Sequence, residues 1–415
     1  MSGSENKKKT GKYIARTLAV VSMVLCVCAA VIGMQHFLCI PGSYDDNRVL
    51  MLHKEPADTI DVLFIGSSAT YADYSAAYAY EKYGFTSYPF AISGAPCTNW
   101  KPALKDALRT QNPKLVVVDV YGGGYEPETI RTRSFQTYTI MSHQPVSMDK
   151  IRTAKEVSAE VERTSVSSLI MPFLKFHYRV PSNLKDIRKR IASEQYGPSP
   201  LKGIEVLSDS VKYGKPDESG FSDDTISLDS QTEATIREFI EYCKAENIKV
   251  MFVKFPLILR AKDPDEVDVN LRANRILEIA DEYGCPALNM QKYFYEIGLD
   301  NKSDYYNHGH TNTRGQKKVT AYLCDYIQET FGIGPSELDE STREEWEKSV
   351  VYYEALNELS EALIRQEKAV SIGESPSTVE YLDRIIAGED ADIVAADYME
   401  AYPLSRARTD AKGEG

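Results

Sequence analysis

The sequence predicts an α/β fold in which a parallel sheet lies between two layers of helices, a three-layer α/β/α sandwich. Two of its strand segments are almost uniformly apolar, residues 115–120 apart from Asp119 and residues 250–253 throughout, which is typical of strands covered on both faces. Amphipathic helical segments separate the strand segments, as in a sheet whose strands all run in the same direction. The predicted strands are residues 61–67, 87–93, 114–121, 249–255 and 287–290.

A long interruption, about residues 122–228, separates the third predicted strand from the fourth. It begins with three glycines and mixes polar turns with short apolar fragments. We interpret it as an insertion at the carboxyl edge of the third strand, where ligand-facing loops grow in open α/β sheets. Regular structure resumes at Ser230, where a capping box opens a helix with its apolar residues on one face.

The first 40 residues have the pattern of a membrane anchor, because basic residues precede an uncharged run of 24 residues, 17–40. As a helix this run would span about 36 Å, enough for a hydrocarbon layer of about 30 Å. The positive-inside rule then keeps residues 1–16 in the cytoplasm and places the rest of the chain outside the cell membrane, with residues 41–57 as a juxtamembrane linker. A cleaved signal peptide is the alternative, since the alanines at residues 29–30 could precede a cleavage site.

A helical extension is expected beyond the main unit, over residues 333–415. Residues 313–331 have the pattern of the last helix of the main unit. A second capping box, at Ser341, then starts a helix with an apolar stripe, which favours packing on the main unit, with a partner surface as the alternative. The chain ends in an acidic tail.

The composition excludes some classes of function. Of 415 residues, 43% are hydrophobic, enough to bury a large core, and the formal net charge is −13. Nucleic-acid binding requires a basic face, so it is not expected. The cysteines have no metal-ligand spacing, and we interpret those beyond the apolar run as small buried hydrophobes, with one disulfide as the alternative. No metal and no cofactor is expected.

Two short motifs, far apart in the sequence, suggest acyl-transfer chemistry. The first predicted strand ends in Gly66, Ser67 and Ser68, and His310 follows a loop late in the main unit. A serine hydroxyl is a poor nucleophile until a base such as imidazole takes its proton. Ser68 would lie on a rigid turn beside free N–H groups of the following helix, and Gly66 would allow a close turn. Taken alone, Gly-Ser-Ser is also typical of a helix cap.

Residues 58–332 resemble the SGNH (GDSL) hydrolase superfamily, and more closely its membrane-anchored extracytoplasmic branch. The Gly-Asp-Ser block of that superfamily corresponds to residues 66–68, and its glycine block to residues 91–95. Its last block corresponds to His310, which is followed by Asn312 and Gly315. The resemblance therefore implies an SGNH-like fold for the main unit.

The resemblance also implies a role for each block. Ser68 would be the nucleophile and its own N–H an oxyanion donor, Gly94 would be the second donor, and His310 would be the base. Relatives in the anchored branch act in acetylation or alanylation of cell-surface polymers. This implies an acylated surface polysaccharide as the substrate and a membrane-bound acyltransferase as a candidate partner.

Three positions depart from the family pattern. Asn307 stands three residues before His310, where the family has aspartate, and an amide can orient imidazole but cannot stabilise imidazolium by charge. Asp304 would compensate if the loop folds back, and otherwise the site would run as a serine–histidine dyad. Ser67 replaces the aspartate of the first block, and the Gly-x-Asn-Asp block is missing, which leaves one oxyanion donor unassigned.

The expected function is an extracytoplasmic serine esterase or acyltransferase that acts on O-acetyl groups of a cell-surface glycan through an acyl-serine intermediate. One alternative is a non-catalytic module that binds glycan or docks a membrane acyltransferase. Another is a lipid or thioester esterase, because fold does not decide substrate. His308 could be a loop residue, a substrate contact or the true base, and the Asn312 and Gly315 pattern favours His310 as the base. Further candidates at the site, each with an equally plain structural role, are His143, His177, Arg179 and Lys254.

Overall fold

The computed structural model describes residues 2–35, 43–185, 197–216, 218–260 and 262–402. At its centre lies a five-stranded parallel sheet with the strand order β2-β1-β3-β5-β6. This confirms the predicted fold class. Each strand falls inside a predicted strand segment: β1 (Val62–Gly66), β2 (Ser87–Ala91), β3 (Leu115–Asp119), β5 (Val250–Lys254) and β6 (Ala287–Asn289).

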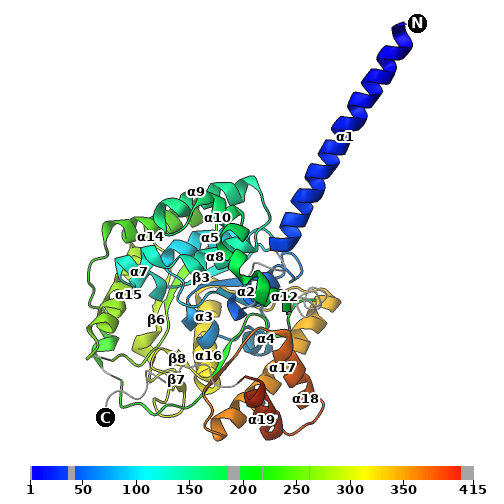
Figure 1. The fold of residues 1–415 in the computed structure, drawn as a ribbon. Helices are drawn as coiled ribbons and strands as arrows, with labels where there is room; N and C mark the ends of the chain where they lie inside the picture. Colours follow the sequence, from blue (N-terminus) through cyan, green and yellow to red (C-terminus); the bar gives the residue numbers. More distant parts are fainter. Residues whose placement is uncertain (1, 36–42, 186–196, 217, 261, 403–415) are drawn as a thin grey trace.

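Helices cover both faces of the sheet (Figure 1). On one side lie α5 (Trp100–Ala107) and α14 (Ser230–Ala245), with α15 (Pro264–Glu282) beside β6, and on the other lie α3 (Ser68–Asp73), α4 (Ala76–Tyr83) and α16 (Thr313–Phe331). From β1 the chain passes first to β2 on one side and then to β3 on the other. Ligands of open α/β sheets bind at such a switch point, beyond the carboxyl ends of the strands.

The apolar strands form the main hydrophobic core, in which every residue of β1, β2 and β3 is buried. Two short 3-10 helices, η2 (Cys97–Asn99) and η5 (Met290–Tyr293), follow β2 and β6. Four cysteines are buried and unpaired, which confirms their interpretation as small buried hydrophobes: Cys97, Cys243, Cys285 and Cys324.

The predicted insertion between β3 and α14 is largely helical and has a small core of its own around Tyr138, Val157 and Leu169. Its elements are α6 (Tyr121–Gly124), α7 (Pro127–Thr132), α8 (Ser134–Ser142), α9 (Met148–Glu160), α10 (Val166–Ile170), α11 (Phe173–Phe176), η3 (His177–Arg179), α12 (Val180–Lys185), β4 (Val206–Ser208) and η4 (Glu218–Phe221).

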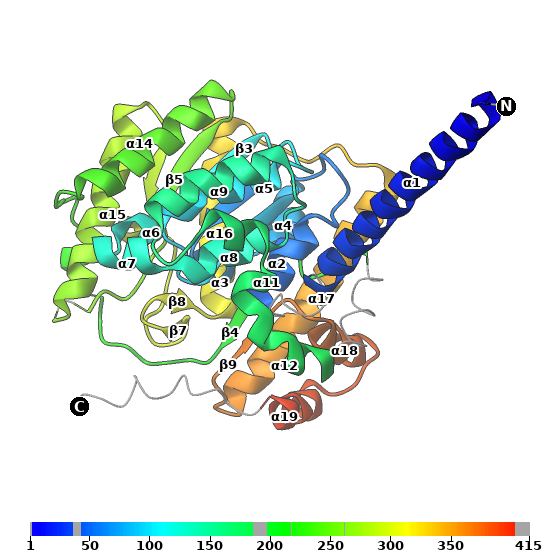
Figure 2. The same ribbon diagram turned by 45° about the horizontal axis from the view of Figure 1, so that its top comes forward.

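The C-terminal extension packs on the main unit (Figure 2). It consists of α17 (Glu340–Arg365), β9 (Val370–Ile372), α18 (Pro376–Ile386) and α19 (Ala391–Ala401), and β9 pairs antiparallel with β4. On α17, Trp346 is buried in the main core, whereas Leu356 and Leu363 belong to a second core shared with α18 and α19. The apolar stripe of α17 is therefore an internal packing surface. Of the predicted acidic tail, residues 403–415 lie outside the described residues.

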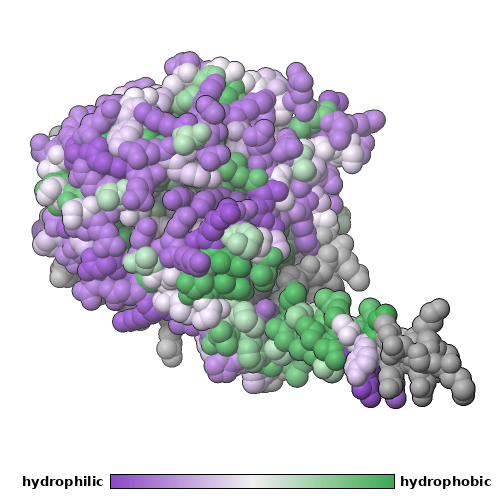
Figure 3. All heavy atoms as spheres, turned by 90° about the horizontal axis from the view of Figure 1, so that it is seen from above, coloured by the Kyte–Doolittle hydropathy of each residue, from purple (hydrophilic) through white to green (hydrophobic). Residues whose placement is uncertain are grey.

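The N-terminal helix α1 (Ser2–Met34) projects from the body, and its apolar surface stands out against the mostly hydrophilic main unit (Figure 3). The stretch Gly11–Met34 is long and apolar enough to cross a membrane, a criterion that a signal sequence at this position also meets. Residues 36–40 of the predicted apolar run lie outside the described residues.

The segment expected as a juxtamembrane linker differs from that expectation. It contains α2 (Tyr44–Leu52), which buries Val49 and Leu52 in the main core. The helix begins with a capping box, in which the side chains of Ser43 and Asp46 each accept a hydrogen bond from the other residue's backbone N–H. Such a cap satisfies N–H groups that a short helix would otherwise leave unpaired.

Candidate active site

The turn between β1 and α3 holds two serines in opposite directions. Ser67 donates from its N–H and its hydroxyl to one carboxylate oxygen of Asp119, at 3.0 and 2.5 Å. The other oxygen of Asp119 accepts the N–H of Tyr121 at 3.0 Å. Ser67 is thereby buried against the end of β3, with 2% of its surface exposed, while Ser68 begins α3 beside a cavity.

Gly66 is required in this turn because no side chain fits there. A Cβ atom at this position would lie 2.4 Å from Cβ of Asp119 and 2.5 Å from Oγ1 of Thr70. The turn therefore brings the backbone of β1 directly against the end of β3, which fixes the start of α3.

The histidine is carried by a small hairpin of β7 (Tyr305–Asn307) and β8 (His310–Thr311). Nε2 of His310 lies 2.7 Å from Oγ of Ser68, and Nδ1 lies 2.9 Å from Oδ1 of Asn307. The structure thus brings Ser68, His310 and Asn307 together, in the arrangement that the sequence motifs predict.

The hydrogen bonds also determine which ring nitrogen carries the proton. Oδ1 of Asn307 accepts the backbone N–H of Gly309 at 2.9 Å, so this oxygen is an acceptor. Its second partner, Nδ1 of His310, must then be the N–H donor. Nε2 is left with a free lone pair directed at the hydroxyl of Ser68, which is the tautomer that a general base requires.

The half-buried ring of His310 is neutral over the physiological pH range. Desolvation lowers the pKa of His310 to about 4, and the neighbouring His308 acts in the same direction. Asn307 carries no charge that would oppose this effect. The imidazole is therefore free to accept a proton at neutral pH.

Of the two residues considered for orienting His310, the structure places Asn307 and not Asp304 at the ring nitrogen Nδ1. Its carboxylate is buried and accepts hydrogen bonds from the N–H of Asp300 at 2.8 Å and from Nζ of Lys318 at 2.7 Å. The hydroxyl of Ser303 donates to its other oxygen at 3.0 Å. These donors hold Asp304 in the loop before β7, and no hydrogen bond from Asp304 to His310 is among those described.

Gly94 lies in the loop that follows β2, with a left-handed φ of +61°. Its carbonyl oxygen accepts Nη1 of Arg133 at 2.7 Å, and a Cβ atom at Gly94 would lie 2.1 Å from the same nitrogen. Gly94 does not line the cavity beside Ser68. Its predicted role as an oxyanion donor therefore stays a prediction.

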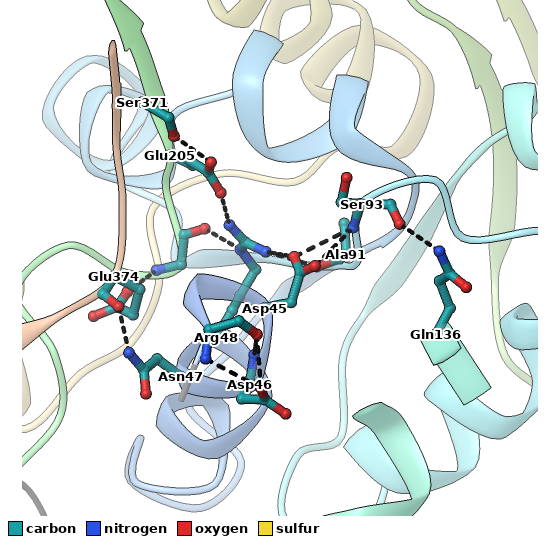
Figure 4. A network of polar contacts seen from close by, with 12 residues as sticks. Asp45, Asp46, Asn47, Arg48, Ala91, Ser93, Gln136, Glu205, Ser371 and Glu374 are labelled. Carbon is teal, nitrogen blue, oxygen red and sulfur yellow. Dashed lines mark hydrogen bonds and ion pairs between the residues drawn. The ribbon is translucent and has the colours of Figure 1, made fainter. Parts of the chain in front are cut away.

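A buried arginine holds the loop between β2 and Gly94, and sequence reasoning missed it. Arg48 of α2 donates to the carbonyl of Ala91 at 3.0 Å and pairs with Asp45 at 2.7 Å and with Glu205 at 2.8 Å (Figure 4). Asp45 in turn accepts the N–H of Ser93 at 3.2 Å. The signal available in the sequence was the Ser43 and Asp46 cap three residues apart, whereas the burial of Arg48 is visible only in the structure.

A cavity of about 410 Å³ opens beside the serine–histidine pair. The aromatic and apolar part of its lining includes Tyr121, Tyr125 and Leu257, and the charged part includes Arg260, Asp265 and Glu266. Because the cavity reaches both Ser68 and His310, a substrate group can approach the hydroxyl from this side.

The second histidine of the motif faces a carboxylate and does not face Ser68. Nε2 of His308 lies 2.6 Å from Oε1 of Glu266, which also pairs with Arg260. Although burial acts to raise it, hydrogen bonds from His308 and Arg260 lower the pKa of Glu266 to about 2. His308 is therefore a lining residue of the cavity, and His310 is the ring placed to act on Ser68.

The remaining candidates do not line the cavity. His143 lies 3.2 Å from Asp46 of α2, and Nζ of Lys254 donates to Oδ1 of Asn274 at 2.7 Å. His177 and Arg179 form part of η3 in the insertion. Over the part of the chain that the structure describes, no group of three His, Cys, Asp or Glu residues is placed to hold a metal ion.

Fold and site together define an α/β protein with a serine–histidine pair at the carboxyl edge of a parallel sheet. No family model matches the chain, and no curated protein matches it. Among solved structures it is similar to an acetylxylan esterase from Geobacillus stearothermophilus, solved as a catalytic mutant, with 12% identity over 69% of this chain and all of the other and a TM-score of 0.34.

A second similar structure is a Bacteroides fragilis protein provisionally named an acylhydrolase. It shares 12% identity over 66% of this chain and 90% of its own length, with a TM-score of 0.31. Both likenesses are distant and concern the fold alone. The chemistry of the site is therefore derived from its own geometry.

Proposed function

We propose that this chain is an extracytoplasmic serine acyl esterase or acyltransferase that acts on ester groups, O-acetyl in the first place, of a cell-surface glycan. The observation that supports the proposal most strongly is the line of hydrogen bonds from Ser68 through His310 to Asn307, at 2.7 and 2.9 Å, beside a cavity. A serine that served only as a helix cap would need no histidine at hydrogen-bond distance.

The first half of the reaction forms an acyl-enzyme. Oγ of Ser68 attacks the ester carbonyl carbon while Nε2 of His310 takes the hydroxyl proton, and the carbonyl oxygen becomes an oxyanion. Ser68 is the first residue of α3, so its own N–H has no acceptor within the helix and is available to this oxyanion, with Gly94 as the second proposed donor. Collapse of the intermediate breaks the ester bond, and His310 returns the proton to the leaving alcohol.

The second half releases the acyl group. A water molecule or a sugar hydroxyl attacks the acyl-serine, and His310 removes its proton and then gives it to Oγ of Ser68. Water yields hydrolysis and a sugar hydroxyl yields transfer. The open, partly aromatic cavity suits a sugar, since the faces of Tyr121 and Tyr125 offer apolar surface between polar groups.

The proposed location follows from α1. A membrane-inserted α1 with a cytoplasmic N-terminus would place the cavity outside the cell membrane, where surface polysaccharides and membrane-bound acyltransferases meet. An acyltransferase that supplies the acyl group is the proposed partner.

The test compares turnover of p-nitrophenyl acetate and of an O-acetylated glycan by the full-length chain and by Ser68→Ala. We expect Ser68→Ala to lose turnover of both esters. Ser158→Ala, which changes a serine of α9 away from the cavity, is the matched control and should retain it. Equal turnover by wild type and Ser68→Ala would contradict the proposal.

A second candidate function is a non-catalytic module that binds glycan or docks an acyltransferase, and the neutral Asn307 in place of a carboxylate favours it. It predicts glycan binding that is unchanged in Ser68→Ala and no labelling of Ser68 by a fluorophosphonate. Labelling of Ser68 that depends on His310 would exclude it. If the chain turns over lipid esters or thioesters but not the acetylated glycan, Ser68 and His310 keep their proposed roles, and the proposed substrate is wrong.

A further inference from the structure

We propose that Asp73 is the positioning residue that holds His310 against Ser68. This inference rests on the proposed function, because it concerns the same serine and histidine. Asp73 is the last residue of α3, the helix that Ser68 begins, and Thr311 directly follows His310 in β8. One carboxylate therefore joins the two elements that carry the pair.

The contact is made by two hydrogen bonds to one residue. Oδ1 of Asp73 accepts the backbone N–H of Thr311 at 2.8 Å and the hydroxyl of Thr311 at 2.8 Å. Neither Asp73 nor Thr311 exposes any surface to solvent. Because the N–H of Thr311 belongs to the peptide group that His310 begins, any movement of this peptide group also moves the histidine.

Neighbouring contacts hold the rest of this region without help from Asp73. Nε2 of Gln316 in α16 donates to the carbonyl of Ala72 at 2.7 Å, and the N–H of Ser75 donates to Oγ1 of Thr320 at 3.0 Å. These bonds join α16 to the end of α3. Apart from the bond between Ser68 and His310, the hydrogen bonds described from α3 to β8 are those of Asp73, so its loss should loosen β8 more than it disturbs the fold.

The carboxylate has no other task that would explain its burial. Its second oxygen, Oδ2, is buried without a hydrogen-bond partner. Desolvation raises the pKa of Asp73 to about 7, against the opposing effect of the two bonds from Thr311. The hydrogen bonds to Thr311 require only an acceptor oxygen, which the amide of asparagine also provides.

The experiment measures kcat and KM for p-nitrophenyl acetate, and the rate at which a fluorophosphonate labels Ser68, in full-length Asp73→Ala and Asp73→Asn. Labelling forms a bond from Oγ to phosphorus and releases fluoride, while His310 takes the hydroxyl proton. We expect Asp73→Ala to lower kcat and the labelling rate by about 100-fold, the effect typical of a displacement near 1 Å, with KM nearly unchanged. Asp73→Asn should recover most of both rates.

Asp106→Ala is the matched control, because Asp106 is also a fully buried carboxylate with two side-chain partners, His53 and Arg109, but lies on α5 away from the cavity. It should lower the stability of the fold and leave kcat unchanged. A folded Asp73→Ala protein with wild-type kcat and labelling rate would overturn the proposal. Equal loss in Asp73→Asn and Asp73→Ala would overturn it as well, because the role would then not be that of an acceptor oxygen.

If Asp73→Ala does not fold, Thr311→Val provides the test, because it removes the hydroxyl bond and keeps the N–H bond. A lower kcat at unchanged KM supports the positioning role, and wild-type kcat contradicts it. The two proposals fail in different ways: activity that survives Ser68→Ala removes the proposed function, whereas loss in Ser68→Ala with full activity in Asp73→Ala removes only the positioning role.

Discussion

Asn307 orients the ring of His310 by a hydrogen bond, but it carries no negative charge that would stabilise the protonated ring. Its amide oxygen fixes the Nδ1–H tautomer, because the same oxygen is held by the N–H of Gly309. A carboxylate in this position would also stabilise the imidazolium that forms when Ser68 loses its proton. The neutral partner leaves the pKa of His310 at about 4, so the base is available even in mildly acidic surroundings.

The pH dependence of Asn307→Asp tests this reading. The wild-type protein needs neutral His310, so kcat/KM should be flat near neutrality and fall as the pH drops through about 4. A carboxylate at position 307 favours the protonated ring, so the acid limb should move upward by about one to three pH units. The measurement is the pH profile of kcat/KM for an activated ester. A profile with the same acid limb in both proteins would contradict the assignment of His310 as the titrating base.

Sequence reasoning succeeded at this scale where a short motif fixes the geometry. Asn307 and His310 are three residues apart on one hairpin, and Ser68 ends a buried strand, so their spacing limits where the side chains can lie. Asp304 could not be placed in this way, because Lys318 and the N–H of Asp300, which hold it, come from loop and helix positions whose approach the sequence does not show. Asp119 was missed for the same reason, although an acidic residue at the end of an apolar strand was a visible sign.

At the scale of elements, the close contact between β1 and β3 determines where α3 begins. The turn needs a residue without a side chain at position 66 and a carboxylate at the end of β3 to accept the bonds of Ser67. Gly66 and Asp119 therefore determine the geometry of the turn in the absence of substrate. The position of Ser68 beside the cavity follows from them.

Gly66→Ala should therefore lower kcat strongly, although it adds only one methyl group. The new methyl group would meet Asp119 and Thr70, and overpacking of this kind costs about 1–3 kcal/mol. Displacement of Ser68 should lower kcat by about 100-fold. The control is Gly334→Ala, since a Cβ atom at Gly334 would meet nothing within 4 Å. Similar kcat values in Gly66→Ala and wild type would show that the turn tolerates the methyl group.

Because nearly uniform apolar segments must be buried on both faces, and because amphipathic helices alternate with the strands, the five strands were predictable. Helix α2 was not, since it is short and its charged residues, among them Asp45 and Arg48, resemble a solvated linker. Their partners, Ser93 and Glu205, come from distant parts of the chain. A charged segment that folds inward is recognised only when those partners are known.

At the scale of the whole molecule, Arg48 connects the N-terminal segment to both the sheet and the insertion (Figure 4). It is fully buried, its guanidinium lies 3.9 Å from the ring centre of Tyr71 in α3, and it donates to the carbonyl of Gly203 at 2.7 Å. Glu205 also accepts the hydroxyl of Ser371 in β9, so the C-terminal extension joins the same network. The region next to the proposed membrane anchor is thereby part of the folded domain.

Arg48→Ala should lower the free energy of unfolding by about 3–5 kcal/mol, because it leaves the largely buried charges of Asp45 and Glu205 without the opposite charge of Arg48. Chemical denaturation of the detergent-solubilised full-length chain measures the loss. Arg152→Ala breaks a pair with Asp149 in which the two side chains are 68% and 88% exposed, and it should cost only about 0–1 kcal/mol. Equal costs for the two variants would mean that the buried network contributes no more than a surface pair.

The most direct measurement identifies the atom that carries the acyl group. The full-length chain is mixed with p-nitrophenyl acetate, quenched with acid during turnover, digested and examined by peptide mass spectrometry. An acetyl group on Ser68 that is present in the wild type and strongly reduced in His310→Ala is the predicted result. Acetyl on another residue, or equal acetylation of Ser68 in His310→Ala, would contradict the assignment of these two residues as nucleophile and base.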